Sequence, residues 1–194
     1  VNDGANTWIV TAQVWGSETE NKEVGVIVSE DDGLTWSPFR RVSPNTRLTN
    51  GAHRNPTITT DKQGIWLVAW VREPADGTGV TAPVFAFSTD NGANWNGPLP
   101  IGGAPESRSG ESYTPLVATD GVGNWLTVWE TTESWENGQG EDRDLLYSVS
   151  SSGGVQWTTP RPVNLSAGED GLIDDGGASL AADRHGTWLS VWTS

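Results

Sequence analysis

Ser29-Glu30-Asp31-Asp32-Gly33-Leu34-Thr35-Trp36 is an eight-residue motif that recurs further along the chain. A second copy runs from Ser88 to Trp95, and a third, weaker copy runs from Ser150 to Trp157. The closing tryptophans of successive copies are 59 and 62 residues apart (95−36 and 157−95). A motif that returns at a nearly fixed period indicates a duplicated supersecondary unit, so we expect a repeat architecture with about 60 residues per unit.

A second motif keeps the same period. Trp66-Leu-Val-Ala-Trp70 returns as Trp125-Leu-Thr-Val-Trp129 and Trp188-Leu-Ser-Val-Trp192, and a shorter copy begins at Trp8. The first tryptophans of these copies are 58, 59 and 63 residues apart (66−8, 125−66 and 188−125). Because the motif is apolar at nearly every position, it predicts a strand that is buried on both faces.

Each unit is expected to contain four short strands. A run such as Asn55–Thr60 opens the unit, and the tight turn Asp61–Gly64 connects it to the tryptophan strand. A third apolar run, such as Val84–Phe87, precedes the eight-residue motif, and a fourth, such as Pro98–Ile101, follows it. With no helical period in the chain, this order favours an all-β fold, a β-propeller of four-stranded antiparallel blades, over a β-sandwich.

The repeats extend over the whole chain of 194 residues. We expect one partial propeller domain, 1–194, with repeats at approximately 1–54, 55–112 and 113–175 and a partial repeat at 176–194. This amounts to about three blades, whereas a closed propeller has at least about four. Uncovered blade faces favour association, so we expect the ring to be completed by self-association or by sequence outside this chain.

Composition excludes several classes of partner. The chain has 25 acidic and 11 basic residues and a formal charge of −14, which makes nucleic acid and anionic membrane surfaces poor partners. No run approaches the ~18 apolar residues of a membrane span, so no membrane insertion is expected. There is no cysteine, and no cofactor or metal is expected except Ca²⁺ at acidic loops, with Asp170, Asp174 and Asp175 as candidate ligands. The alternative interpretation of the acidity is solubility.

The eight-residue motif resembles the Asp-box, or BNR repeat, of the sialidase-like β-propellers. The matching residues are Ser29, Asp31, Gly33 and Trp36 in the first copy, Ser88, Asp90, Gly92 and Trp95 in the second, and Ser150, Gly154 and Trp157 in the third, where Ser152 replaces the aspartate. The resemblance covers three periods, essentially the whole chain. It implies a structural role for these residues, since in this family the Asp-box lies on the face opposite the catalytic pocket.

The resemblance also implies candidate site residues. Sialidases of this shape bind the substrate carboxylate with three arginines and use a tyrosine nucleophile, helped by a glutamate, with an aspartate as acid/base. Arg54 precedes Asn55 and Pro56 and so keeps the Arg and Pro of a family motif, but the aromatic and Ile of that motif are absent. Arg54 is either a carboxylate ligand or an ion-paired arginine of the rim. Tyr113 and Glu111 are the candidate catalytic pair.

Loops that enter the first strand and leave the second should meet at one rim of the propeller, where arginines, carboxylates and aromatic rings suit sugar recognition. The candidate substrate-binding residues there are Arg54, Arg108, Trp135 and Arg143. The alternative is that these loops are polar only because they are exposed.

We therefore expect an extracytoplasmic protein with a glycan-directed role, either recognition or an exo-glycosidase type of reaction. The catalytic set is incomplete, so we expect no robust sialidase activity. The alternative is a non-catalytic structural or protein-interaction module that assembles into a closed ring.

Overall fold

A computed structural model describes residues 1–15, 22–43, 51–74, 81–103, 110–132, 142–164 and 173–194. These residues form strands and one short 3-10 helix, Ile101–Gly103. None of their helices is long and apolar enough to span a bilayer.

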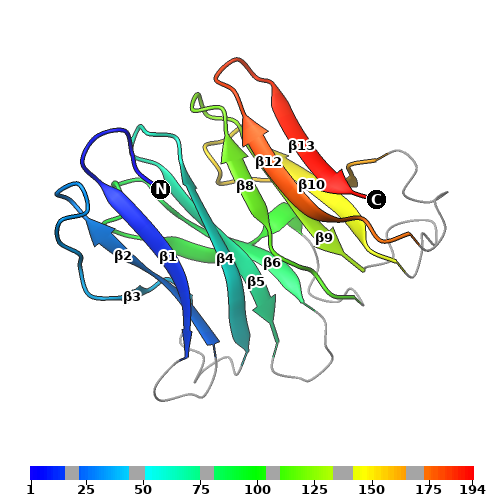
Figure 1. Cartoon of the computed structure of the whole chain (residues 1–194), viewed down its shortest axis with the longest axis horizontal. Helices are drawn as coiled ribbons and strands as arrows, with labels where there is room; N and C mark the ends of the chain where they lie inside the picture. Colours follow the sequence, from blue (N-terminus) through cyan, green and yellow to red (C-terminus); the bar gives the residue numbers. More distant parts are fainter. Residues whose placement is uncertain (16–21, 44–50, 75–80, 104–109, 133–141, 165–172) are drawn as a thin grey trace.

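The strands form four antiparallel sheets (Figure 1). Sheet 1 contains β1 (Trp8–Trp15), β2 (Lys22–Ser29) and β3 (Arg40–Arg41); sheet 2 contains β4 (Ala52–Thr60), β5 (Trp66–Glu73), β6 (Ala82–Ser88) and β7 (Asn96–Pro100); sheet 3 contains β8 (Leu116–Thr119), β9 (Trp125–Thr131), β10 (Asp144–Ser150) and β11 (Arg161–Pro162); sheet 4 contains β12 (Gly176–Ala182) and β13 (Trp188–Thr193).

The four sheets follow one another in a fan, in the order of the sequence (Figure 1). The first strands of neighbouring sheets lie together, β4 beside β8 and β8 beside β12, and both β1 and β2 contact β4. Sheets 2 and 3 each contain four antiparallel strands in sequence order. The all-β propeller architecture with four-stranded blades is therefore confirmed. The blade number of the closed ring and the division into repeats stay predictions.

The core lies between successive sheets, because alternate residues of each strand point to opposite faces. On β5, Trp66, Val68 and Trp70 pack against sheet 1, whereas Leu67 and Ala69 pack against sheet 3. All five are fully buried, as expected for the tryptophan strand. In β13 the same motif alternates between half-buried and exposed positions, because the described part of the chain covers only one face of sheet 4.

The first Asp-box turn is closed by the side chain of Asp31. The Thr35 hydroxyl and backbone N–H donate to its two carboxylate oxygens at 2.6 and 2.8 Å, and the Ser29 hydroxyl donates at 2.8 Å. These hydrogen bonds, above all those from Thr35, lower the pKa of Asp31 to about 2. Trp36 Nε1 donates to the carbonyl oxygen of Gly33 at 3.1 Å, so the indole folds back under the turn.

The other two turns repeat this pattern with different residues. The carboxylate of Asp90 accepts hydrogen bonds from the backbone N–H and side-chain amide of Asn94, both at 2.7 Å. In the third turn the hydroxyl of Ser152 accepts the backbone N–H of Gln156 at 2.8 Å. A hydroxyl therefore preserves the backbone hydrogen bond of the turn without a negative charge.

Candidate functional site

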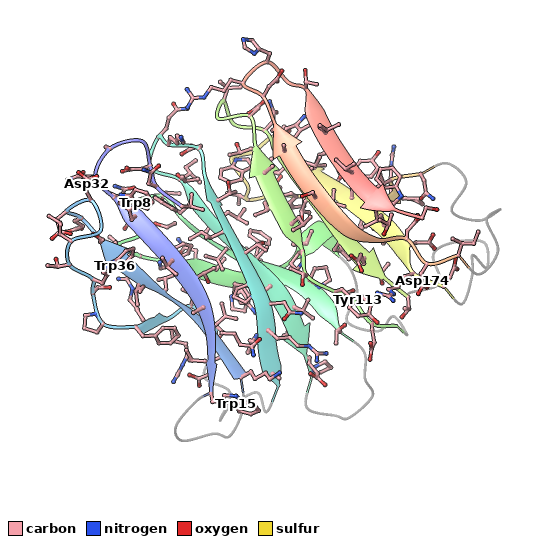
Figure 2. The ribbon with its side chains drawn as sticks, viewed as in Figure 1. Trp8, Trp15, Asp32, Trp36, Tyr113 and Asp174 are labelled. Atoms are coloured by element: carbon pink, nitrogen blue, oxygen red, sulfur yellow. The ribbon has the colours of Figure 1, made fainter. Side chains whose placement is uncertain are left out.

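Opposite ends of the sheets carry different kinds of residue. The Asp-box turns follow β2, β6 and β10 at one end, which we call the Asp-box rim. At the other end lie the last residues of β1, β5 and β9 and the residues that precede β8, β10 and β12; we call this end the loop rim. Figure 2 shows Asp32 and Trp36 at the Asp-box rim, and Trp15, Tyr113 and Asp174 at the loop rim.

Tyr113 is held at the loop rim by the backbone. Its N–H donates to the carbonyl oxygen of Glu130 at 2.8 Å, and the N–H of Thr132 donates to the carbonyl oxygen of Glu111 at 2.9 Å. The segment before β8 therefore runs antiparallel to the end of β9. The Tyr113 hydroxyl donates to Oε2 of Glu111 at 3.0 Å, so the two candidate catalytic residues are in direct contact.

Arg143 joins this pair to two further carboxylates. Its Nη2 donates to Oδ2 of Asp174 at 3.0 Å, and its Nη1 lies 3.5 Å from Oε2 of Glu130. The guanidinium carbon also lies 5.2 Å from the centroid of the Tyr113 ring, within the range of a cation–π contact. We call Glu111, Tyr113, Glu130, Arg143 and Asp174 the rim network.

The network connects sheet 3 to sheet 4. Glu130 lies on β9, and its Oε1 accepts the N–H of Gly177 on β12 at 2.8 Å. Asp174 lies two residues before the start of β12, and its Oδ1 accepts the backbone N–H of Arg143 at 3.0 Å. Side chains that are far apart in the sequence are thereby fixed on the ends of three strands.

The surroundings of Tyr113 and Asp174 reinforce the protonation states that these groups ordinarily have at neutral pH. Burial and the neighbouring carboxylate of Glu111 raise the pKa of Tyr113, so the phenol keeps its proton at neutral pH. Hydrogen bonds from the backbone and guanidinium of Arg143 lower the pKa of Asp174, so this carboxyl group is ionised. The site therefore combines a neutral hydroxyl donor with fixed charged groups.

The other predicted residues have different surroundings. Arg54 lies on β4 and forms an ion pair with Glu73, with 3.3 Å between Nη2 and Oε2. Arg108, Trp135 and Asp170 lie outside the described residues. Of the candidate Ca²⁺ ligands, Asp174 is paired with Arg143. No group of three or more His, Cys, Asp or Glu side chains arranged for a metal ion occurs in the described part of the chain.

His53 is a buried residue whose environment the sequence did not reveal. Trp70 Nε1 donates to Nδ1 of His53 at 2.8 Å, and the imidazole is fully buried. Burial and the positive charge of Arg72 lower the pKa of His53 to about 4. The ring is therefore neutral at physiological pH and acts as a hydrogen-bond acceptor inside the sheet.

A groove of about 810 Å³ opens on the Asp-box rim between the first two Asp-box turns, and Trp36, Phe39 and Arg40 contribute to its lining. Two carboxylates line it, Glu30 and Asp31, and that of Asp31 is already engaged by the turn. The groove lacks the convergence of tyrosine, arginine and carboxylates found at the loop rim, which is therefore the better candidate site.

The sequence matches the model of the BNR repeat-like domain over residues 2–174. The chain belongs to the BNR repeat-like domain family. This BNR repeat protein also has the fold of several glycosidases of known structure. A sequence search of curated proteins found no significant match.

An α-L-arabinanase from Penicillium chrysogenum, solved with arabinobiose, is 16% identical to this chain and superposes with a TM-score of 0.64. The superposition covers 95% of this chain and 53% of the arabinanase. A Hadza microbial sialidase is 17% identical with a TM-score of 0.60, and covers 84% of this chain and 36% of its own. An endo-arabinase from Bacteroides thetaiotaomicron is 15% identical with a TM-score of 0.57, and covers 96% and 66%. The chain spans about half of the arabinanase from Penicillium, and these likenesses establish the fold alone.

Proposed function

We propose that this BNR repeat protein recognises a neutral glycan at the loop rim through the rim network. The observation that carries the proposal is the convergence of Tyr113, Arg143 and three carboxylates from separate strand ends. Sugar hydroxyls both donate and accept hydrogen bonds, so a site with carboxylate acceptors and guanidinium and phenol donors suits them. An extracytoplasmic location stays a prediction.

The charge of the network argues against an acidic sugar. Arg143 is its one guanidinium, and it is already paired with Asp174 and Glu130. A sialoside carboxylate would have to compete with these two carboxylates and approach a third, Glu111, in a chain with a formal charge of −14. Among the structural neighbours, the arabinanase was solved with arabinobiose, a neutral sugar, which makes arabino-oligosaccharides suitable first ligands to test.

A glycosidase reaction at the same site is the further step of this proposal. Glu111 accepts the hydrogen bond of the Tyr113 hydroxyl and is therefore positioned to take its proton if the phenol acts as a nucleophile. Hydrolysis also needs an acid/base group on the leaving-group side. The carboxylates of Glu130 and Asp174 are both ion-paired with Arg143, so neither is free to act as this group. We therefore favour a binding role over hydrolysis.

Calorimetric titration with arabinobiose, arabinohexaose and sialyllactose tests the proposal. We expect binding of the arabino-oligosaccharides and at least about tenfold weaker binding of sialyllactose. Tyr113→Phe should weaken binding of the neutral ligand roughly fivefold, because one hydrogen bond between the phenol and a sugar hydroxyl, worth about 1 kcal/mol, is lost. Tyr147→Phe is the matched control, since Tyr147 is the only other tyrosine and packs on β10 against the core.

Two results would contradict this proposal. One is binding of sialyllactose as tight as that of the neutral sugars. The other is equal loss of affinity in Tyr113→Phe and Tyr147→Phe, which would point to a general structural effect instead of a contact at the loop rim.

A second candidate role is assembly, and we propose it from the outer sheet faces. Where two sheets pack, a residue of the tryptophan strand of one sheet contacts the Asp-box glycine of the next. A methyl group added to Gly92 of sheet 2 would lie 2.4 Å from Cδ1 of Ile9 in sheet 1, and one added to Gly154 of sheet 3 would lie 2.9 Å from Cδ1 of Leu67 in sheet 2. Leu189 on β13 occupies the corresponding position of sheet 4 but is 63% exposed. Among the described residues no other sheet covers the outer side of Gly33 in sheet 1, and a methyl group placed on Gly33 would have only its own Trp36 within 4 Å.

The outer faces of sheets 1 and 4 thus present the two halves of the interface that recurs inside the chain. A head-to-tail contact between copies would cover Leu189 of one copy with the Gly33 turn of the next. Val10→Asp should block one face and Leu189→Asp the other, leaving each variant monomeric. Sedimentation velocity of a mixture should then show a 1:1 dimer formed through the two unmodified faces; a monomeric unmodified protein at high concentration would rule assembly out.

A further inference from the structure

Trp15 closes β1 at the loop rim, and its side chain is 69% exposed. A tryptophan is highly buried on average, and Trp15 is the most exposed tryptophan among the described residues, followed by Trp36 at 40%. Lys22, the cross-strand partner of Trp15, holds its ammonium group 5.6 Å from the centroid of the indole. The ring is therefore oriented by a neighbouring strand and still accessible.

The repeat pattern gives no structural reason for this tryptophan. Ten of the twelve tryptophans of the chain occupy recurring positions: Trp8, Trp66, Trp125 and Trp188; Trp70, Trp129 and Trp192; and Trp36, Trp95 and Trp157. Trp15 corresponds to Glu73 and Thr132 in the next two units (15+58 and 73+59) and has no tryptophan counterpart there. A residue that the architecture does not require, at the rim where the loops lie, indicates a contact with a ligand.

The position of sheet 1 at the outside of the fan does not explain the exposure of Trp15. Gln13 shares its face of β1, and Oε1 of Gln13 accepts the backbone N–H of Asn55 on β4 at 3.2 Å. The face that carries Trp15 is therefore turned towards sheet 2. There the start of β4 and the end of β5 carry the ion pair of Arg54 and Glu73, which is partly exposed.

We infer that Trp15 forms a second sugar-binding position on the loop rim, for a neutral oligosaccharide longer than a disaccharide. The apolar face of a sugar ring would stack on the indole, and Arg54 and Glu73 would bind hydroxyls of the ring beside it. This inference rests on the proposed function of the rim network, because it extends the ligand of that site. Packed sheets lie about 10 Å apart, so sheets 1 and 3 are separated by about 20 Å, and a ligand that reaches both sites needs several sugar rings.

Titration of Trp15→Ala with arabinobiose and arabinohexaose tests the inference. The unmodified protein should bind arabinohexaose at least about fivefold more tightly than arabinobiose, and Trp15→Ala should remove this difference while affinity for arabinobiose stays the same. Trp15→Phe, which keeps an aromatic ring, should retain most of it. Trp36→Ala is the matched control, because Trp36 is also exposed but lies on the Asp-box rim.

The possible results separate this inference from the proposed function. Equal affinity of the unmodified protein for both sugars, or an unchanged affinity of Trp15→Ala for arabinohexaose, would overturn the role of Trp15 and leave the rim network intact. Loss of arabinohexaose binding in Trp36→Ala alone would move the second position to the groove on the Asp-box rim. Binding of neither sugar by the unmodified protein would overturn both.

Discussion

Acidification from pH 7 to pH 4.5 should destabilise the folded protein through His53. The pKa of its buried imidazole is lowered to about 4, against 6.5 for the free side chain. The unfolded chain therefore binds a proton more readily than the folded protein between these two values. The contribution to stability is complete above pH 6.5 and is lost as the pH falls towards 4.

The expected loss follows from the two pKa values. Integrating the difference in bound protons from pH 7 to pH 4.5 gives about 2 kcal/mol of unfolding free energy. The carboxylates of Asp31 and Asp90, whose pKa values are lowered to about 2 from 3.8, lose their contribution only at lower pH. His53 is therefore the group expected to dominate this window.

Urea unfolding followed by tryptophan fluorescence at both pH values measures the effect. His53→Gln removes the titration but keeps an oxygen that can accept the N–H of Trp70, so its stability should change by less than about 0.5 kcal/mol between the two pH values. His185→Gln is the control, because the His185 side chain is 87% exposed. A pH dependence that is the same in His53→Gln as in the unmodified protein would refute the argument.

Two further predictions concern the packing of the sheets. Gly92→Ala should destabilise the protein by roughly 1–3 kcal/mol more than Gly33→Ala in urea unfolding. Both residues have φ near +85°, but only Gly92 faces a neighbouring sheet, at Ile9. Equal losses of stability would show that the backbone conformation alone determines the effect of the substitution. The double substitution Ser152→Asp with Gln156→Thr should raise the Tm and stabilise the third turn by roughly 1 kcal/mol, since it restores the side-chain hydrogen bond that Asp31 and Thr35 make in the first turn; a lowered Tm at neutral pH would speak against a stabilising role for the carboxylate.

The fold could be predicted because its signals are local and repeated. The Asp-box turns recur with residues that satisfy turn amides, and the tryptophan strands recur with residues that are apolar on both faces. Contact between Glu111 and Tyr113 could also be anticipated, because the two side chains are two residues apart on one extended segment. What that contact does for a ligand stays a prediction.

The rest of the rim network could not be predicted in this way. Arg143 and Asp174 are 31 residues apart and belong to different sheets, so their hydrogen bond depends on how sheet 4 packs against sheet 3. The sequence around His53 gives no sign of its burial, because only the fold turns the imidazole inwards to accept the N–H of Trp70. Trp15 differs in this respect, since a tryptophan outside the repeat pattern can be recognised in the sequence itself.

The sequence by itself determined the antiparallel blade and its period, because turn chemistry and alternation along a strand act between residues that are close in the chain. Only the tertiary structure decided which charges meet, which histidine is desolvated and which indole remains accessible. Those properties depend on the packing of one sheet against the next. Packing brings together residues whose contact cannot be predicted from their spacing in the sequence.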